Sequence, residues 1–185
     1  MAKLCNLLVI VSLMAVLKWA QAEQSWANRV VGEKETMTNL QFYFHDTVSG
    51  KNPSAIVVVQ PNSTKQTLKA TGFGTIVMAD DPLTVRPDPN SKLVGRAQGL
   101  YGSAGQTIIS LIMDMSLIFT DGCYNGSSLS ISGINRALNP VREIPIVGGT
   151  GIFRMARGFA IASTYSFNVT SGDAIVGYNV TVFNN

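Results

Sequence analysis

The chain has 185 residues, enough for one folded domain with a sizeable hydrophobic core. Hydrophobic residues make up 46% of it and charged residues 14%, a composition that excludes an intrinsically disordered protein. The 14 Lys and Arg residues are scattered among 11 Asp and Glu residues, and no basic block indicates binding to nucleic acid or to an anionic membrane.

Residues 1–22 have the features of a secretory signal peptide. Lys3 supplies the positive start, Leu7 to Leu17 form an apolar run, and Ala20-Gln21-Ala22 matches a small-x-small cleavage site. The apolar run is too short to span a bilayer comfortably. We therefore expect a secreted, extracellular protein.

Residues 23–38 are polar and aperiodic, and we expect them to form an N-terminal arm before a domain at residues 39–185. In that domain nearly every segment predicts a β-strand, because Val, Ile, Phe, Tyr and Thr are enriched between Gly, Pro, Asn and Asp. Strands are expected at residues 40–48, 55–60, 73–79, 93–101, 107–119, 128–132, 144–147, 153–167 and 174–183.

Apolar residues alternate most clearly in residues 109–119 and 174–182. Long strands with short connections predict an antiparallel meander, and closing it into an eight-stranded β-barrel with a central cavity removes its exposed edges. The second face of residues 108–118 is also fairly apolar, which indicates that another subunit covers it.

The first predicted strand carries an acid on an apolar face, since Asp46 shares its face with Phe42 and Phe44. A buried carboxylate is costly unless it is paired, hydrogen-bonded or protonated, and burial would raise its pKa into the range useful for acid–base chemistry. A satisfied internal pair with an arginine is the open alternative. The sole histidine, His45, points to the opposite face, which argues against a Ser-His-Asp triad.

Residues 79–91 read as a proline-stiffened loop, in which Asp80 and Asp81 are interpreted as turn and cap formers rather than cation ligands. We therefore predict no metal site, and no fingerprint for a cofactor is present. The glycine-rich strand at residues 95–102 would leave room for a ligand or for close neighbours, and Tyr101 offers a phenolic hydroxyl there. Arg142, just before an apolar strand, could anchor a phenolate or a carboxylate.

Cys123 is the only cysteine left once the signal peptide is removed, so no internal disulfide is expected, and we expect this side chain to be buried. Sequons for N-glycosylation begin at Asn62, Asn125, Asn168 and Asn179.

Four motifs in this order resemble those of plant dirigent proteins, and the resemblance runs from about residue 40 to the C-terminus. The motifs lie at residues 42–46, 80–84, 95–101 and 141–158. The resemblance implies an eight-stranded barrel that forms a homotrimer in the apoplast or cell wall. It also implies a phenolic intermediate of lignan, lignin-like or isoflavonoid biosynthesis, with a separate laccase or peroxidase as a possible source of radicals.

Carried over by motif, the family's pocket acid, tyrosine and arginine match Asp46, Tyr101 and Arg142, which we expect to be the catalytic groups. Residues expected to contact the substrate are Phe42, Phe44, Asn135 and Arg157. Lignan-forming members have an aspartate where this chain has Asn135, and they usually carry a cysteine pair. Both differences favour the branch that includes the pterocarpan synthases.

Two functions therefore remain open. The chain is either a non-catalytic guide for the stereoselective coupling or cyclisation of phenolic radicals and quinone methides, or a dehydratase of pterocarpan synthase type acting on a 2′-hydroxyisoflavanol. A polysaccharide-binding module is disfavoured because Trp26 is the only tryptophan outside the signal peptide.

Overall fold

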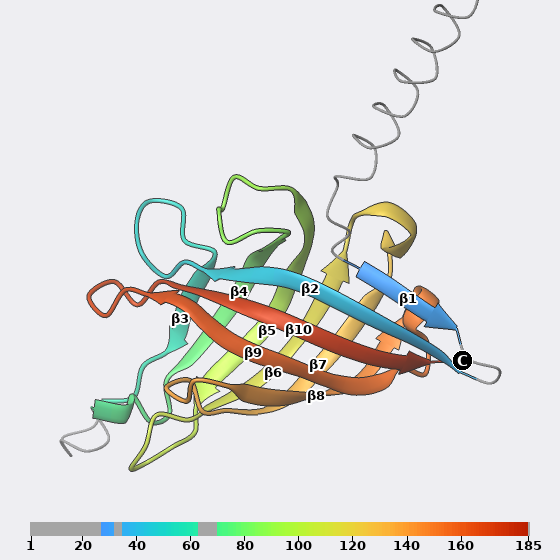
Figure 1. Ribbon diagram of the computed structural model, residues 1–185. Coiled ribbons are helices and arrows are strands. Elements are labelled where there is room, and N and C mark those ends of the chain that lie inside the picture. Colours follow the sequence, from blue (N-terminus) through green and yellow to red (C-terminus); the bar gives the residue numbers. More distant parts are fainter. Residues whose placement is uncertain (1–26, 32–34, 63–69, 185) are drawn as a thin grey trace, which may run out of the picture.

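The computed structural model describes residues 27–31, 35–62 and 70–184, and the predicted signal peptide lies outside these residues. Ten β-strands form one antiparallel sheet in this part of the chain (Figure 1). Their bounds are β1 Ala27–Val31, β2 Thr36–Asp46, β3 Ala55–Val59, β4 Ile76–Thr84, β5 Leu93–Ser103, β6 Leu111–Phe119, β7 Ser128–Asn135, β8 Arg142–Thr150, β9 Arg157–Phe167 and β10 Ala174–Asn184. Two 3₁₀ turns, η1 at Gly122–Tyr124 and η2 at Gly151–Phe153, follow β6 and β8.

The sheet closes on itself, because β2 pairs with β10 along its length and also with β4. The second pairing is short and joins Tyr43 to Thr84 and Phe44 to Leu83. Strands β2 and β4 to β10 thus form a closed eight-stranded antiparallel barrel, which confirms the predicted fold class. The remaining strands extend the sheet outside the barrel, β1 beside β2 and β3 beside β4 (Figure 1).

Part of the segment predicted to be an N-terminal arm belongs to the sheet. β1 pairs with residues 36–40 of β2, and Thr36 and Thr38 are buried. The reason is that β4 leaves the edge of β2 before these residues, so β1 supplies the hydrogen-bonding partner that this part of β2 would otherwise lack.

The predicted loop at residues 79–91 is also wrong in its first half, because β4 continues through Asp80, Asp81 and Pro82 to Thr84. The amide of Asp80 donates to the carbonyl of Ser54, so the nitrogen of Pro82, two residues on, points to the same side of the strand. On that side Pro82 lies between the residues that pair with β3 and those that pair with β2. A proline is tolerated there because no ladder bond is lost.

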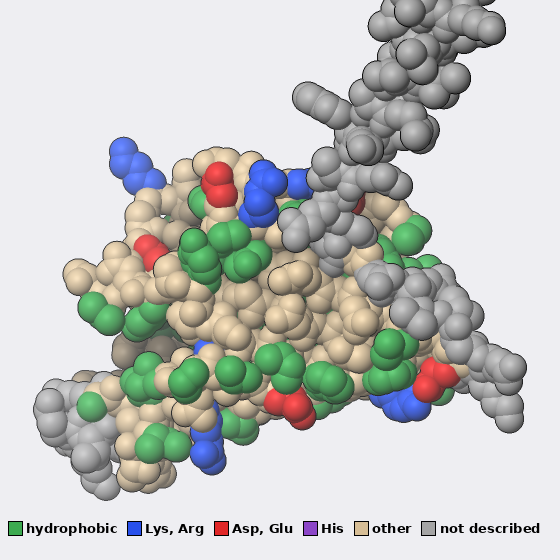
Figure 2. Space-filling view, viewed as in Figure 1, with side chains coloured by type: hydrophobic (Ala, Val, Ile, Leu, Met, Phe, Trp, Pro, Cys, Tyr) green, Lys and Arg blue, Asp and Glu red, His purple; other side chains and the backbone are tan. Residues whose placement is uncertain are grey.

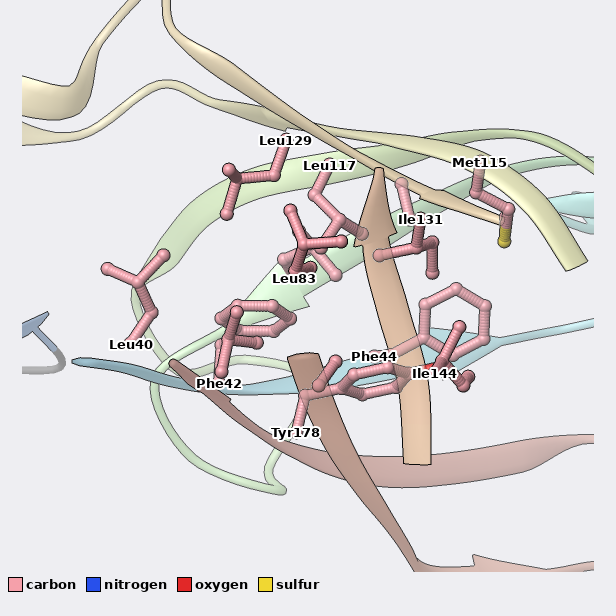
Figure 3. Close-up of a cluster of buried hydrophobic side chains, with 14 of the residues drawn as sticks. Leu40, Phe42, Phe44, Leu83, Met115, Leu117, Leu129, Ile131, Ile144 and Tyr178 are labelled. Carbon is pink, nitrogen blue, oxygen red and sulfur yellow. The ribbon is translucent and has the colours of Figure 1, made fainter. Parts of the chain in front are cut away.

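The barrel is filled at the end that carries the two 3₁₀ turns. Phe42 is fully buried, stacks on Tyr178 with ring centroids 5.8 Å apart, and meets Phe119 edge-on. Phe119 in turn packs against Phe153 of η2. Figure 3 shows part of this core, in which labelled side chains from β2, β4, β6, β7, β8 and β10 point toward one apolar centre. The opposite end of the barrel is hollow.

Glycines in β5 make room for the neighbouring strand. A Cβ atom at Gly95 would lie 2.3 Å from the carbonyl oxygen of Ile118, and one at Gly99 would lie 2.3 Å from that of Asp114. Of the two explanations left open for this strand, close neighbours therefore account for these two positions.

Several large apolar side chains lie on the outside of the barrel. Ile112 and Ile134 pair across β6 and β7 and are 38% and 48% exposed, and Val147 of β8 is 60% exposed. Figure 2 shows hydrophobic side chains in a row where β8 runs in Figure 1. Cys123, which we expected to be buried, is exposed on η1. No helix among the described residues has the length and apolar character needed to cross a bilayer.

Candidate functional site

A cavity of about 570 Å³ occupies the hollow end of the barrel, a size typical of small-molecule sites. Apolar side chains form most of its wall, and the polar groups are few. It is lined by Phe44, Asp46, Tyr101, Ile109, Leu111, Met113, Asn135, Ala137, Leu138, Asn139, Pro140, Arg142, Thr164, Phe167, Gly172, Ala174, Val176 and Tyr178. The three predicted catalytic residues therefore come together here from β2, β5 and β8.

Asp46 ends β2 and points into this cavity because it continues the inward alternation of Leu40, Phe42 and Phe44. Its Oδ2 accepts a hydrogen bond of 2.8 Å from the hydroxyl of Tyr101, whereas its Oδ1 is buried without a partner. Burial raises the pKa of Asp46 to about 6, against the opposing effect of the Tyr101 hydrogen bond. This carboxyl group is therefore largely protonated below pH 6, and a minor fraction of it still carries a proton at neutral pH.

The alternative of an internal pair between Asp46 and an arginine is not what the structure shows. The salt bridges among the described residues are Lys92–Asp121, Arg96–Asp80 and Arg157–Glu35. Asp46 is instead held by Tyr101, whose own pKa is raised well above its usual range by burial and by the charge of Asp46. Tyr101 therefore stays protonated and acts as a hydrogen-bond donor.

Arg142 lies buried in the cavity wall among neutral partners. Its Nε donates to Asn135 Oδ1 at 3.2 Å, and its Nη1 donates to the carbonyl of Asn139 at 3.1 Å and to Thr164 Oγ1 at 2.8 Å. Burial lowers the pKa of Arg142, but a guanidinium remains charged in proteins. None of these partners is acidic, so the positive charge is available to an anionic oxygen in the cavity.

Two of the four residues expected to contact the substrate line the cavity, namely Phe44 and Asn135. Phe42 lies deeper, within the packed core. Arg157 is exposed, forms a salt bridge with Glu35 and lies over the ring of Phe183, with its Cζ 5.7 Å from the ring centroid. The structure thus places Arg157 outside the cavity, because β9 starts at the filled end of the barrel.

Sequence reasoning missed a second buried acid. Asp81 points inward from β4 and is fully buried, and its Oδ1 accepts a 2.5 Å hydrogen bond from the Ser54 hydroxyl. Its Oδ2 is buried without a partner, and burial raises its pKa to about 7. A signal was available, since Val77, Ala79, Asp81 and Leu83 alternate inward, but treating Asp80 and Asp81 as turn residues ended the predicted strand too early.

Two further wall residues, Thr164 and Tyr178, were also missed. Tyr178 shares the inward alternation of β10 with Val176 and Val180, so its presence in the wall could have been expected. Thr164 has no such signal, because its role as a partner of Arg142 depends on the register between β8 and β9, where Arg142 lies opposite Ala162.

His45 lies away from the carboxyl group of Asp46, as the alternation predicts. Its Nε2 lies 2.6 Å from Thr84 Oγ1, and the Thr84 hydroxyl donates to the carbonyl of Arg86, so Nε2 carries the proton in this pair. Burial lowers the pKa of His45, which favours the neutral ring. A smaller cavity of about 390 Å³ lies beside it and shares Asp46, Phe167 and Ala174 with the main one.

Other predicted positions lie at the surface. The four sequon asparagines Asn62, Asn125, Asn168 and Asn179 are exposed. Within the described residues, no group of three or more His, Cys, Asp or Glu side chains could hold a metal ion.

Comparison with known proteins agrees with the motifs and the fold. The profile of the family described as "Dirigent-like protein" matches residues 37–183. Dirigent protein 23 of Arabidopsis thaliana is 54% identical over 177 residues, which cover 95% of this chain and 94% of that protein. Pterocarpan synthase 1 of Glycyrrhiza echinata is 51% identical over 162 residues, covering 86% and 85%.

A solved structure of a pterocarpan synthase dirigent protein is 49% identical and has a TM-score of 0.76, covering 84% of this chain and 89% of that one. The expected resemblance to plant dirigent proteins, including its leaning toward pterocarpan synthases, is confirmed. Motifs, barrel and relatives together show that this chain belongs to the dirigent-like protein family.

Proposed function

We propose that this protein binds a planar phenolic intermediate in the barrel cavity and directs its stereoselective coupling or cyclisation through a quinone methide. The observation that carries the proposal is the Asp46–Tyr101 pair, an acid with a raised pKa that faces an apolar chamber opposite the unneutralised Arg142. Groups held in fixed positions within a closed chamber exclude water and fix which face of a reactive ligand is open to attack.

The chemistry needs no oxidant once the quinone methide precursor is present. Asp46 donates its proton to a benzylic hydroxyl, the C–O bond breaks and water leaves. The phenolic oxygen conjugated with that carbon gives up its proton, which restores the proton on the Asp46 carboxylate, and becomes the carbonyl of the quinone methide. Arg142 stabilises the negative charge that develops on this oxygen. A second hydroxyl of the ligand then adds to the methide carbon, and its proton returns to the phenolic oxygen.

Two versions of this function differ in whether the protein works alone. The family name supports a guide that acts on radicals made by a separate laccase or peroxidase. The similarity to pterocarpan synthases and the raised pKa of Asp46 favour unaided dehydration of a 2′-hydroxyisoflavanol. Incubating the protein with each substrate class, with and without an oxidase, and separating the products by chiral chromatography distinguishes them.

Substitution Asp46→Asn tests the proposal directly. It removes the proton donor at little cost in volume, so the rate of product formation should fall by about 100-fold or more. For a pure guide the enantiomeric excess should collapse instead. Asp114→Asn is the matched control, because it removes a carboxylate from the outer face of β6. Full rate and full stereoselectivity in Asp46→Asn would exclude this role for the acid.

We also propose that the protein is secreted to the apoplast as a glycosylated homotrimer. The N-terminal sequence and the exposed sequons support secretion and glycosylation. The apolar pair Ile112–Ile134 on the outer wall supports self-association, since exposed apolar surface of this kind is usually covered. Mass spectrometry of protein secreted by plant cells, followed by sedimentation analysis, tests each part.

A further inference from the structure

The two inward acids of the barrel, Asp46 and Asp81, lie just beyond the seam of paired residues between β2 and β4. The strands pair antiparallel through Tyr43 with Thr84 and Phe44 with Leu83. The pairing ends there, and the next inward positions, two residues further along each strand, are Asp46 and Asp81, beside the start of β3. Both side chains belong to the inward-facing set of their strands.

The hydrogen bonds of the two acids are complementary. Asp46 uses Oδ2 to accept from Tyr101, and Asp81 uses Oδ1 to accept from Ser54. In each carboxyl group the other oxygen, Asp46 Oδ1 and Asp81 Oδ2, is buried without a partner. Buried polar atoms of this kind are rare in folded proteins and call for a partner. A proton held between these two oxygens would satisfy both at once.

Ser54 is held in place for this contact. It lies just before β3, where its amide and that of Ala55 donate to the carbonyl of Thr47 and its own carbonyl accepts from Asp80. The start of β3 therefore lies between β2 and β4, at the point where these two strands separate. Ser54, at the start of β3, contacts Asp81, which is fully buried.

We propose that Asp46 and Asp81 share a single proton across this seam, and that Asp81 is a positioning residue that keeps the catalytic carboxyl of Asp46 protonated. Asp46 would be the member that meets the ligand, because it lines the cavity. The catalytic part of this inference rests on the proposed function, whereas the sharing of the proton does not.

The charges around the two acids favour a pair that holds one proton over a pair that is fully ionised. The charges of Asp46 and Asp80 raise the pKa of Asp81, and the charge of Asp173, from the β9–β10 loop, raises the pKa of Asp46. Tyr101 and Ser54 donate to the pair and act in the opposite direction, as does Arg96 on β5 toward Asp81. The ionised form of Asp46 raises the pKa of Asp81, so a negative charge on one acid disfavours a second negative charge on the other.

The pair can donate its shared proton during the reaction and then regain one. When Asp46 passes a proton to the leaving hydroxyl, the pair becomes doubly ionised, a state that strongly favours taking a proton back. The phenolic O–H, which must lose its proton as the quinone methide forms, supplies it. The pair thus ends each turnover with the single proton it started with, and water is the only group lost.

Carboxyl ¹³C NMR of the unliganded wild-type protein tests the sharing without any substrate. We expect the signals of Asp46 and Asp81 each to respond in two common steps on titration, as coupled groups do. Two independent single-step curves, with neither nucleus sensing the other, would overturn the inference. Because this measurement needs no turnover, its outcome is independent of whether the proposed function holds.

The pH profile of activity then tests the positioning role. In Asp81→Asn, loss of the neighbouring charge should lower the pH at which activity is lost on the alkaline side by about one pH unit, and Asp81→Glu should restore most of the shift. Asp114→Asn, which removes an exposed carboxylate from the outer face of β6, should leave the profile in place. An Asp81→Asn profile that is lower at every pH but unshifted would mean a structural role only and would refute the positioning role.

Discussion

Arg142 and Asn135 are hydrogen-bonded to each other in the cavity wall. The amide oxygen of Asn135 accepts from the guanidinium without neutralising it, and its amide nitrogen lies 3.8 Å from Met113 Sδ. An aspartate in the same place would form a buried ion pair with Arg142. The asparagine therefore leaves a positive charge in the wall to meet an anionic phenolic oxygen.

Substitution Asn135→Asp should weaken the binding of a phenolate and spare that of a neutral ligand. Pairing with the introduced carboxylate removes one charge-assisted hydrogen bond from Arg142, which corresponds to about a tenfold higher Kd. Isothermal titration with a nitrophenol above its own pKa, compared with the matching nitroanisole, measures the difference. Equal losses for both ligands would mean that Arg142 does not recognise charge.

At the scale of elements, the close packing of β5 on β6 decides where side chains are tolerated. Gly99 has a φ of +153° and faces the carbonyl of Asp114, so it lacks both the backbone conformation and the space for a side chain. Gly148, in β8, has nothing within 4 Å of the place where a Cβ would lie. The two glycines thus form a matched pair on two strands of the same barrel.

Substitution Gly99→Ala should reduce the free energy of unfolding by about 3 kcal/mol, because the added methyl group forces β5 away from β6. Gly148→Ala should change it by less than about 1 kcal/mol. Urea denaturation monitored by far-UV circular dichroism measures the free energy of unfolding of both variants. If the two variants were equally stable, the close approach of the strands would be of no energetic consequence.

The strands themselves were largely predictable, because the alternation of apolar residues fixes which side of each strand faces inward. The acid Asp46 was found for this reason, as an exception within a clear pattern. Asp81 obeys the same pattern but was missed, because its position next to a proline outweighed the alternation. Pairing partners such as Thr164 and Ser54 could not be predicted, because they depend on register and on where β3 inserts between two distant strands.

For the whole molecule, the two buried acids link folding to pH. Both have a pKa in the folded state, about 6 for Asp46 and about 7 for Asp81, that lies above the ordinary value of 3.8. The folded state therefore binds more protons than the unfolded state between these values. Their contribution to stability is fully present below pH 4 or so and is lost as the pH rises through 6 to 7. His45, whose pKa burial lowers, opposes this trend near its ordinary value of 6.5.

We expect the melting temperature to be higher near pH 5 than near pH 8, with Asp46 alone accounting for up to about 3 kcal/mol of unfolding free energy. The double substitution of Asp46→Asn with Asp81→Asn should flatten this dependence. Asp114→Asn should leave it unchanged, because that side chain is exposed on β6. Scanning calorimetry across the pH range gives the slope, and a wild-type protein that gains stability toward pH 8 would contradict the linkage.

The short junction between β2 and β4 bears on how barrels of this kind diversify. Only two residue pairs hold it, and the start of β3 separates the strands beyond them. A change in the length of the connection between β2 and β3 would therefore shift the part of the wall that carries Asp46 and Asp81. It would not disturb the continuous ladders around the rest of the barrel. We therefore expect that a change of length in this one loop could alter the size of ligand accommodated while the rest of the barrel keeps its structure.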